Sequence, residues 1–490
     1  MKGLTLRILF LCFSLIYFNS IASTIGIATG NKTVDGRPLL FKNKDRVDNY
    51  PSDVNYYDGG STYYSYVFQQ NDGQDHTRAR MGINTVGFGI VYSDSENLEG
   101  ASIGPYGSQL TAIALKTCAT IDDFRNLLNE TNGARKAHNH FAVIDSTGKG
   151  SMFEVSGYSY VEIPVIDSIG TMANTAKYHP DRGDPAAGST SPQREARANY
   201  LLTHGPQEGL SYRYFTDEII KDFCETQEDE DSMPVGQYYT NPVLSRYKTA
   251  AGSVIKGILH GDSILVESAM WLCLSEPSLT IALPFFTNVS EIPPFIRSGA
   301  SGDGMAGSSD KVRQLVYNYA GGRYSDRYAD TYDLLRIREH TFKIQDSLFN
   351  SYEEHLTDWL GQSPEVAADN MKDWMYDIDT WAKSKYDSLI IILDVNDIKN
   401  PNIKSFELKQ NYPNPFNSMT KIKYSIPQKQ NVKLSIYDSL GKLVTILVDK
   451  EQSSGKYEVV FNASSLSSGE YFYKLEIDGY IKTKKMIYLK

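Results

Sequence analysis

Cysteine is scarce in this sequence, with four residues in 490. Cys12 lies in an apolar N-terminal segment, and Cys118, Cys224 and Cys273 are far apart along the chain. An odd number of widely spaced cysteines argues against a disulfide framework and against a cysteine-based metal site. One bridge remains open as an alternative, and its pairing is not readable from the sequence.

Motifs of the common metal- and nucleotide-dependent enzymes are absent. There is no HExxH zinc helix, no GxSxG nucleophile elbow, no Walker phosphate loop and no CxxC pair. The eight histidines are scattered. His138 and His140 alternate along a predicted strand and share a face, but with no third ligand in view they favour strand packing. We therefore expect neither a metal nor a cofactor.

Positive charge and long apolar runs are also in short supply. The net charge is −10, and an acidic surface repels phosphate backbones, so nucleic acid is not an expected partner. After the N-terminal segment, no stretch approaches the ~20 apolar residues that span a bilayer. Internal repeats and low-complexity tracts are missing as well.

The N-terminus has the three parts of an export signal. Lys2 and Arg7 give a positive start, the segment 9–18 is apolar, and Ser20-Ile21-Ala22 ends in small residues at the two positions that a signal peptidase reads. This pattern predicts a cleavable signal peptide over residues 1–22, so that the mature chain begins at Ser23. A short membrane anchor is the alternative.

A boundary is expected where a helical-looking run gives way to the polar, turn-rich segment 392–404. Before it, residues 23–391 mix strands and helices in blocks, which is typical of α+β layers. After it, residues 405–490 contain five or six short alternating strands between Gly, Ser and Asn turns. This pattern predicts a small all-β sandwich.

Alternation and β-branched content predict strands in the first half of the core, and apolar residues at helical spacing predict four helices. The strands are 23–30, 37–43, 87–93, 140–146, 150–157 and 159–167, and the helices are 121–131, 194–204, 331–360 and 365–389.

The C-terminal segment carries a specific set of motifs: NYPNPFN within 408–427, IYDSLGKLV at 436–444 and LSSGEYFYKLEIDG at 466–479. They resemble the type A C-terminal sorting domain of the type IX secretion system. The resemblance implies passage through the outer membrane of a Bacteroidetes-like bacterium to the cell surface or medium, with the secretion machinery as partner. A carbohydrate-binding or adhesion sandwich is the alternative, and the tail indicates destination rather than activity.

The new N-terminus is the most informative place for chemistry. Signal cleavage leaves Ser23 with a hydroxyl and a free α-amine, which together form a nucleophile and its base. Because the ordinary pKa of an α-amine is about 7.7–8.0, an appreciable fraction is neutral near pH 7. The simpler interpretation is that Ser23 is only where the signal peptide ends.

The residues that follow add support. STIGIATGNKTVDGRPLLFKNKD (23–45) contains a strand, an Asp35-Gly36 turn, a second strand and then Lys42-Asn43-x-Asp45. It resembles the opening of the N-terminal-nucleophile (Ntn) hydrolases of linear amides, which include bile salt hydrolases, penicillin V acylases, acyl-CoA:aminopenicillanate acyltransferases and related dipeptidases. Two positions depart from that family: Ser23 replaces a cysteine, and Lys42 replaces an arginine, which keeps the charge without the planar fork.

Further segments follow in the order of that family: MGINTVGFGIVYSD (81–94), HNHFAVIDSTGKGSMFEVS (138–156), GTMANT (170–175), SPQREAR (191–197) and LCLSEPSLTIALPFF (272–286). By this resemblance Asp94 falls where bile salt hydrolases carry an oxyanion-hole asparagine. Asn174 is the implied oxyanion donor, and Arg194 is the implied late arginine of the pocket.

Each implied role has a structural alternative. Asp45 would hold the Ser23 amine, or it would form a strand-end ion pair with Lys42. Lys42 or Arg194 would tune the amine or bind an anionic end of the substrate. Arg194 would otherwise be a solvated residue in the first turn of its helix.

The two oxyanion candidates differ in their chemistry. Asn174 would donate an amide N–H, or it would only cap a turn. Ionised Asp94 cannot donate, so a second donor would be a backbone N–H or Ser93.

These patterns together predict a four-layer αββα Ntn-hydrolase core, with Ser23 opening a strand in one of two packed antiparallel sheets. The expected activity is hydrolysis of linear amide bonds in N-acyl amino acids, bile-salt-like or penicillin-like amides, or small peptides. The alternative is a non-catalytic surface or adhesion protein that keeps this fold.

Overall fold

The structure is a computed structural model of the whole chain, and it describes residues 23–45, 52–70, 76–225, 237–297, 304–317, 328–397, 407–426, 429–439, 441–453, 455–477 and 480–490. The predicted signal peptide, residues 1–22, lies outside these described residues.

The first sheet of the core is antiparallel and begins with the strand that starts at Ser23. Its first hairpin joins β1 (Ser23–Ala28) to β2 (Leu39–Asp45), and Gly36 in the connection has a φ of 77°, which glycine adopts without steric cost. The predicted Asp35-Gly36 turn is therefore confirmed. The strand order is β10 (Ile169–Met172), β1, β2, β12 (Thr249–Lys256), β13 (Ala269–Cys273) and β14 (Leu283–Phe285).

The second sheet is an antiparallel meander whose strands lie in chain order. All of its neighbours are paired antiparallel. Its strands are β3 (Asp53–Tyr57), β4 (Tyr66–Gln70), β5 (Met81–Asn84), β6 (Gly89–Asp94), β7 (Asn139–Ile144), β8 (Gly150–Val155) and β9 (Tyr160–Val165).

The two sheets pack face to face through a shared apolar cluster. Ile25 and Ile27 of β1 lie in the same buried cluster as Met81, Val91 and Ala142 of the second sheet. Because side chains alternate across a strand, every second residue of β1, beginning with Ser23, faces the second sheet.

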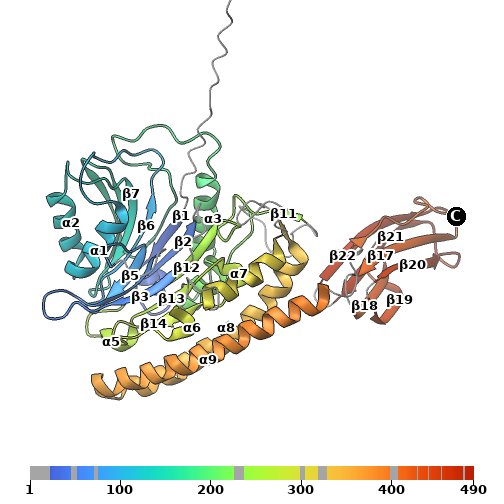
Figure 1. Cartoon of the computed structure of the whole chain (residues 1–490). Helices are drawn as coiled ribbons and strands as arrows, with labels where there is room; N and C mark the ends of the chain where they lie inside the picture. The colour runs from blue at the N-terminus through green and yellow to red at the C-terminus, as the bar shows by residue number, and fades with distance from the viewer. Residues whose placement is uncertain are drawn as a thin grey trace, which may run out of the picture.

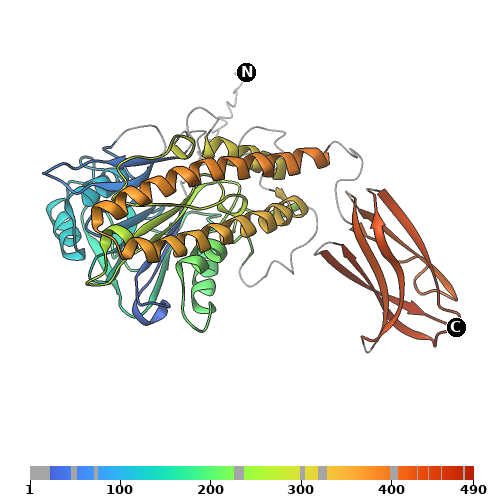
Figure 2. The same cartoon turned by 90° about the horizontal axis from the view of Figure 1, so that it is seen from below.

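Helices cover the outer faces of both sheets (Figure 1). On the second sheet, α1 (Gly107–Thr117) and α2 (Ile121–Glu130) bury Leu110 and Phe124 against Phe141 and Phe153. On the first sheet lie α3 (Ser191–Thr203), α7 (Met305–Val316), α8 (Thr331–Leu360) and α9 (Pro364–Asp397). Figure 2 shows α8 and α9 running side by side.

Shorter elements complete the core. They are η1 (Gly30–Lys32), α4 (Tyr212–Tyr214), η2 (Phe215–Ile219), α5 (Ile264–Glu267), η4 (Pro277–Leu279), α6 (Pro294–Arg297) and a two-stranded sheet of β11 (Gln237–Tyr239) and β15 (Tyr328–Asp330). Within the described residues, we find no helix with the length and apolar character needed to cross a membrane.

The C-terminal strands form two facing sheets, as predicted for a sandwich. One sheet is β16 (Glu407–Leu408), β17 (Met419–Ile426) and β20 (Gly455–Asn462); the other is β19 (Leu443–Gln452), β18 (Gln430–Asp438), β21 (Gly469–Ile477) and β22 (Tyr480–Tyr488). Buried Asn411 of the NYPNPFN motif donates its side-chain amide to the Pro413 carbonyl and the Thr420 hydroxyl. The motif is therefore part of how this sandwich is held together.

The predicted core strands and helices are confirmed, with one correction at the domain boundary. Helix α9 continues to Asp397, so residues 392–397, expected in the linker, are helical. Neither glycine nor proline interrupts this segment before Pro401, and nothing in its local sequence stops the helix.

The tail is expected to fold independently of the core, since its buried cluster shares no residue with the two core clusters. A chain ending after Asp397 should keep the thermal transition of the core, and an isolated 407–490 fragment should show a transition of its own. Scanning calorimetry of the full chain, the truncated chain and the isolated fragment measures these transitions. A core that unfolds at a clearly lower temperature without its tail would contradict it.

Candidate active site

Ser23 lies at the start of β1, on the face that looks toward the second sheet. In the ladder with β2 it is directly opposite Lys44. The β1–β10 register pairs Ile25 with Met172, which places Ser23 beside Asn174, just beyond the end of β10. Ser23 is buried, with 2% of its surface exposed.

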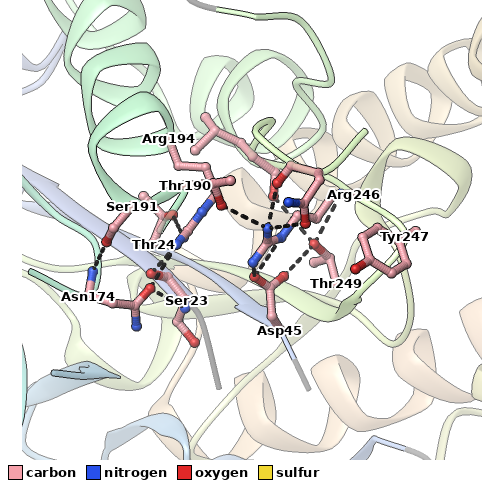
Figure 3. Close-up of polar contacts among 12 residues, drawn as sticks. Ser23, Thr24, Asp45, Asn174, Thr190, Ser191, Arg194, Arg246, Tyr247 and Thr249 are labelled. Carbon is pink, nitrogen blue, oxygen red and sulfur yellow. Dashed lines mark hydrogen bonds and ion pairs between the residues drawn. The ribbon is translucent and has the colours of Figure 1, made fainter. Parts of the chain in front are cut away.

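A hydrogen-bonded unit surrounds the backbone of Ser23 (Figure 3). The Ser23 nitrogen donates to Asn174 Oδ1 at 3.1 Å. Arg194 donates from Nη1 to the Ser23 carbonyl at 3.0 Å and from Nη2 to the same Asn174 Oδ1 at 2.8 Å. These three residues come from β1, from the segment after β10 and from α3, so the tertiary fold assembles the unit.

Arg194 is a buried residue of α3 rather than a solvated one, which settles that alternative. It is 2% exposed, and Nη1 also donates to the Thr24 hydroxyl at 2.6 Å. Burial, with a further contribution from the nearby Arg246 guanidinium, lowers the pKa of Arg194 to about 9. The guanidinium is therefore still charged at pH 7, although no carboxylate among the described residues pairs with it.

The orientation of the Asn174 side chain follows from these bonds. Its Oδ1 accepts from Ser23 and Arg194, which forces the amide nitrogen to the other side. Nδ2 donates to the Asp94 carbonyl at 2.6 Å, and the backbone N–H of Asn174 donates to the Ser191 hydroxyl. Asn174 is therefore held by main-chain and side-chain contacts at once.

Asp94 contacts Asn174 through its backbone carbonyl rather than through its side chain. The carbonyl accepts from Asn174, while the carboxylate accepts from Asn139 Nδ2 at 2.8 Å. The alternative donor, the Ser93 hydroxyl, donates to the Ala173 carbonyl at 2.6 Å. The structure thus brings Asp94 to the site as a support for Asn174.

Asp45 lies on the opposite face of the first sheet from Ser23. Its carboxylate accepts from Arg246 Nε at 2.8 Å and from the Thr249 hydroxyl at 2.8 Å, as Figure 3 shows. The reason is strand alternation: Lys44 is opposite Ser23, so Asp45, one residue later, points away. Neither expected role, holding the Ser23 amine or pairing with Lys42, is observed.

Lys42 faces the second sheet, two residues along β2 from Lys44. Its Nζ donates to the Arg80 carbonyl at 2.9 Å and lies 4.2 Å from the centre of the Tyr92 ring. Burial lowers the pKa of Lys42 to about 7, and the charge of Arg80 lowers it further, while Asp94 and Asp45 act in the opposite direction. Near neutral pH this ammonium is therefore close to losing its proton.

This lowered pKa predicts a pH-dependent stability. Between pH 7 and about 10 the unfolded chain holds a proton on Lys42 that the folded chain does not, so the free energy of unfolding should rise with pH. Lys42→Met should remove this rise and stabilise the core at pH 7 by at most about 4 kcal/mol. Denaturant unfolding at several pH values, with exposed Lys149→Met as control, measures it. If the free energy of unfolding changed with pH in the same way in Lys42→Met and in the unchanged protein, the lowered pKa of Lys42 would be contradicted.

Several contributors to the site carried no recognised signal in the sequence. Lys44, which is opposite Ser23 in the ladder, shares a face with Lys42 because of the strand period of two. Arg246 could not have been found from the sequence, because it lies 201 residues from its partner Asp45. His138 and His140 each contact a backbone carbonyl, that of Ser95 and that of Ala173. In the described ranges, no group of three or more His, Cys, Asp or Glu residues is placed to bind a metal.

Comparisons with known proteins bear on the C-terminal tail. Residues 410–489 match the family described as secretion system C-terminal sorting domain, which confirms that prediction. A search of curated proteins found no match.

Among solved structures, a variant of the conjugated bile acid hydrolase from Clostridium perfringens has a TM-score of 0.36 at 11% identity, covering 54% of this chain and 92% of the other. Penicillin V acylase from Agrobacterium tumefaciens has a TM-score of 0.30 at 12% identity, covering 54% and 86%. Latent PorU from Porphyromonas gingivalis has a TM-score of 0.15 at 21% identity, covering 17% and 9%.

Proposed function

We propose that this protein is a secreted hydrolase of linear amide bonds, with Ser23 as nucleophile and its own α-amine as base. The observation that carries the proposal is the hydrogen-bonded unit of Ser23, Asn174 and Arg194. It holds the nitrogen and the carbonyl of the first residue after the predicted cleavage site, which an ordinary chain end does not require.

The first half of the reaction is acylation. The neutral α-amine takes the hydroxyl proton as Ser23 Oγ bonds to the amide carbon, and the carbonyl electrons move onto oxygen. The amide N–H of Asn174 stabilises this oxyanion, with its direction fixed by Arg194 and the Asp94 carbonyl. When the carbon–nitrogen bond breaks, the ammonium returns the proton to the leaving amine.

The second half is deacylation of the Ser23 ester. The α-amine accepts a proton from water as the water oxygen attacks the ester carbon, and the serine oxygen leaves with that proton. The sum is one amide and one water giving one carboxylic acid and one amine, with Ser23 regenerated.

For the fold, we propose that the core is a four-layer αββα Ntn-hydrolase arrangement. The order of layers is α1 and α2, the second sheet, the first sheet, and then α3 with α7 to α9. The two buried clusters support this, one between the sheets and under the α3 side, the other under α1 and α2.

For the route out of the cell, the sorting domain supports export through the type IX machinery. We propose that the predicted signal peptide delivers the chain across the inner membrane first, and that its removal at Ser23 both matures and activates the protein. The candidate substrates are those that the sequence suggested, namely N-acyl amino acids, bile-salt-like or penicillin-like amides, and small peptides.

Labelling tests this function. N-terminal sequencing and intact mass of the secreted protein should show a chain that begins at Ser23, and an activated acyl ester probe should add one acyl group at residue 23. Peptide mass spectrometry locates the adduct after removal of excess probe. A processed protein that never acylates at residue 23 and cleaves no amide in a broad panel would favour the non-catalytic surface protein.

A further inference from the structure

The inner face of the second sheet changes from apolar to polar between two neighbouring rows of side chains that cross β6, β7 and β8. One row belongs to the buried cluster between the sheets and is apolar: Val91, Ala142 and Met152. The next row lies two residues further along each strand: Ser93, His140 and Glu154. Because side chains alternate across a strand, this second row also faces the first sheet. We call its three residues the polar row.

The polar row is completely enclosed by protein. Ser93 and His140 are 0% exposed and Glu154 is 1% exposed. Burying polar side chains between two sheets costs free energy unless they form hydrogen bonds. All three residues form such bonds with one short stretch of backbone, residues 173–179, which follows β10.

The first two residues of the polar row bind the same carbonyl. The oxygen of Ala173 accepts from Ser93 Oγ at 2.6 Å and from His140 Nδ1 at 2.8 Å. Since a carbonyl can only accept, Nδ1 carries a proton. Burial lowers the pKa of His140, so the ring is neutral at pH 7 and Nε2 has none. Nε2 has no hydrogen-bond partner among the described residues, so His140 acts through its Nδ1–H.

Glu154 holds the other end of the same stretch. Its Oε1 accepts from the backbone N–H of Lys177 at 2.6 Å, and its Oε2 accepts from those of Tyr178 at 2.8 Å and His179 at 2.6 Å. Bonds from N–H groups to a carboxylate are stronger than those between neutral groups. The second sheet therefore fixes the stretch after β10 at its beginning and at its end.

The peptide group between Ala173 and Asn174 is held at both of its polar atoms. Its carbonyl is bound by the polar row, and its N–H donates to the Ser191 hydroxyl of α3 at 2.5 Å (Figure 3). Because a peptide group is planar, bonds at its oxygen and its nitrogen together fix its orientation. This orientation sets the direction in which the Asn174 side chain leaves the backbone to meet the Ser23 nitrogen.

We propose that His140, together with Ser93, is a positioning residue of the Ser23 site: its Nδ1–H holds the Ala173 carbonyl and thereby aims the Asn174 amide at the oxyanion. The inference rests on the proposed function of Ser23. His140 gives up no proton in the reaction. A displacement of about 1 Å at a reacting group can cost 10²-fold in rate, so a bond to the neighbouring peptide matters for the rate.

Backbone hydrogen exchange tests this role without any substrate. His140→Leu removes the Nδ1–H, while the Ser93 bond keeps the Ala173 carbonyl paired, so the protein should still fold. In processed protein, exchange in the peptide 170–179 should become about tenfold faster or more, with α2 unchanged as the internal reference. His140→Asn, whose amide can donate from the place of Nδ1, should restore protection. His260→Leu, at an exposed position, is the control.

Unchanged exchange of 170–179 in His140→Leu overturns the inference, whether or not the protein cleaves amides. Faster exchange in a protein without amidase activity upholds the hold of His140 on this stretch and rejects the proposed function. If His140→Leu does not fold, Ser93→Ala makes the same comparison, because it removes the other donor to the Ala173 carbonyl.

With an active protein, His140→Leu should lower kcat by roughly 10- to 100-fold while KM stays within about threefold. In an Asn174→Ala background the same substitution should cost less than about threefold, because its effect passes through Asn174. A residue that only supports the fold would cost the same in both backgrounds. Equal losses in the two backgrounds would therefore contradict the positioning role.

Discussion

Ser23→Ala should abolish amide hydrolysis, with kcat/KM falling by about 10³-fold or more, while folding is unaffected. The substitution removes the proposed nucleophile, and reactions that lose their nucleophile keep only the rate that binding and the oxyanion hole supply. Among the described residues the Ser23 hydroxyl makes no hydrogen bond, since only its nitrogen and carbonyl are engaged. Steady-state kinetics on processed protein, with a thermal melt, measures both parts.

Ser23→Cys is the matched control for this prediction. It keeps a nucleophile at the same place, and a thiol needs less help from its base, so activity should be retained or raised. Ser23→Ala activity within tenfold of the unchanged protein, with normal folding, would contradict the assignment of Ser23 and require another site.

Asn174→Ala should lower kcat by roughly 10²–10³ with a smaller change in KM, because an oxyanion donor acts in the transition state. The loss should exceed that of Arg194→Met, which leaves the donor in place and removes only the guanidinium that orients it. Asn199→Ala, on the exposed side of α3, is the control for a change of the same chemistry. A loss that appears only in KM would contradict the oxyanion role.

The hairpin could be predicted, and Ser23 proposed as the nucleophile, because the signals for both are local. An Asp-Gly turn between two alternating apolar stretches predicts β1 and β2, and signal-peptide rules predict a cut before Ser23. Asn174 and Arg194 came from the order of motifs along the chain, and the structure brings both to Ser23. The C-terminal sorting domain could be recognised from the sequence because the turns between its strands contain the characteristic motif.

The features that the sequence did not predict depend on strand register and on contacts between residues far apart along the chain. The role expected of Asp45 failed because register decides which face a strand residue occupies. The connection from 29 to 38 holds the turn η1 and a bridge from Thr33 to Leu210, so its length did not reveal the register. The end of α9 was set too early because polar residues at 392–397 were interpreted as a turn, although none of them breaks a helix.

The most direct test of the central claim compares two forms of one protein that differ only at the N-terminus. One form begins at Ser23 and the other keeps a few uncleavable residues before it, so that the nitrogen is an amide and cannot accept a proton. Initial rates on the same amide substrate should differ by at least about 10²-fold in favour of the processed form. Equal rates would contradict the account, since Ser23 would then be only the place where the signal peptide ends.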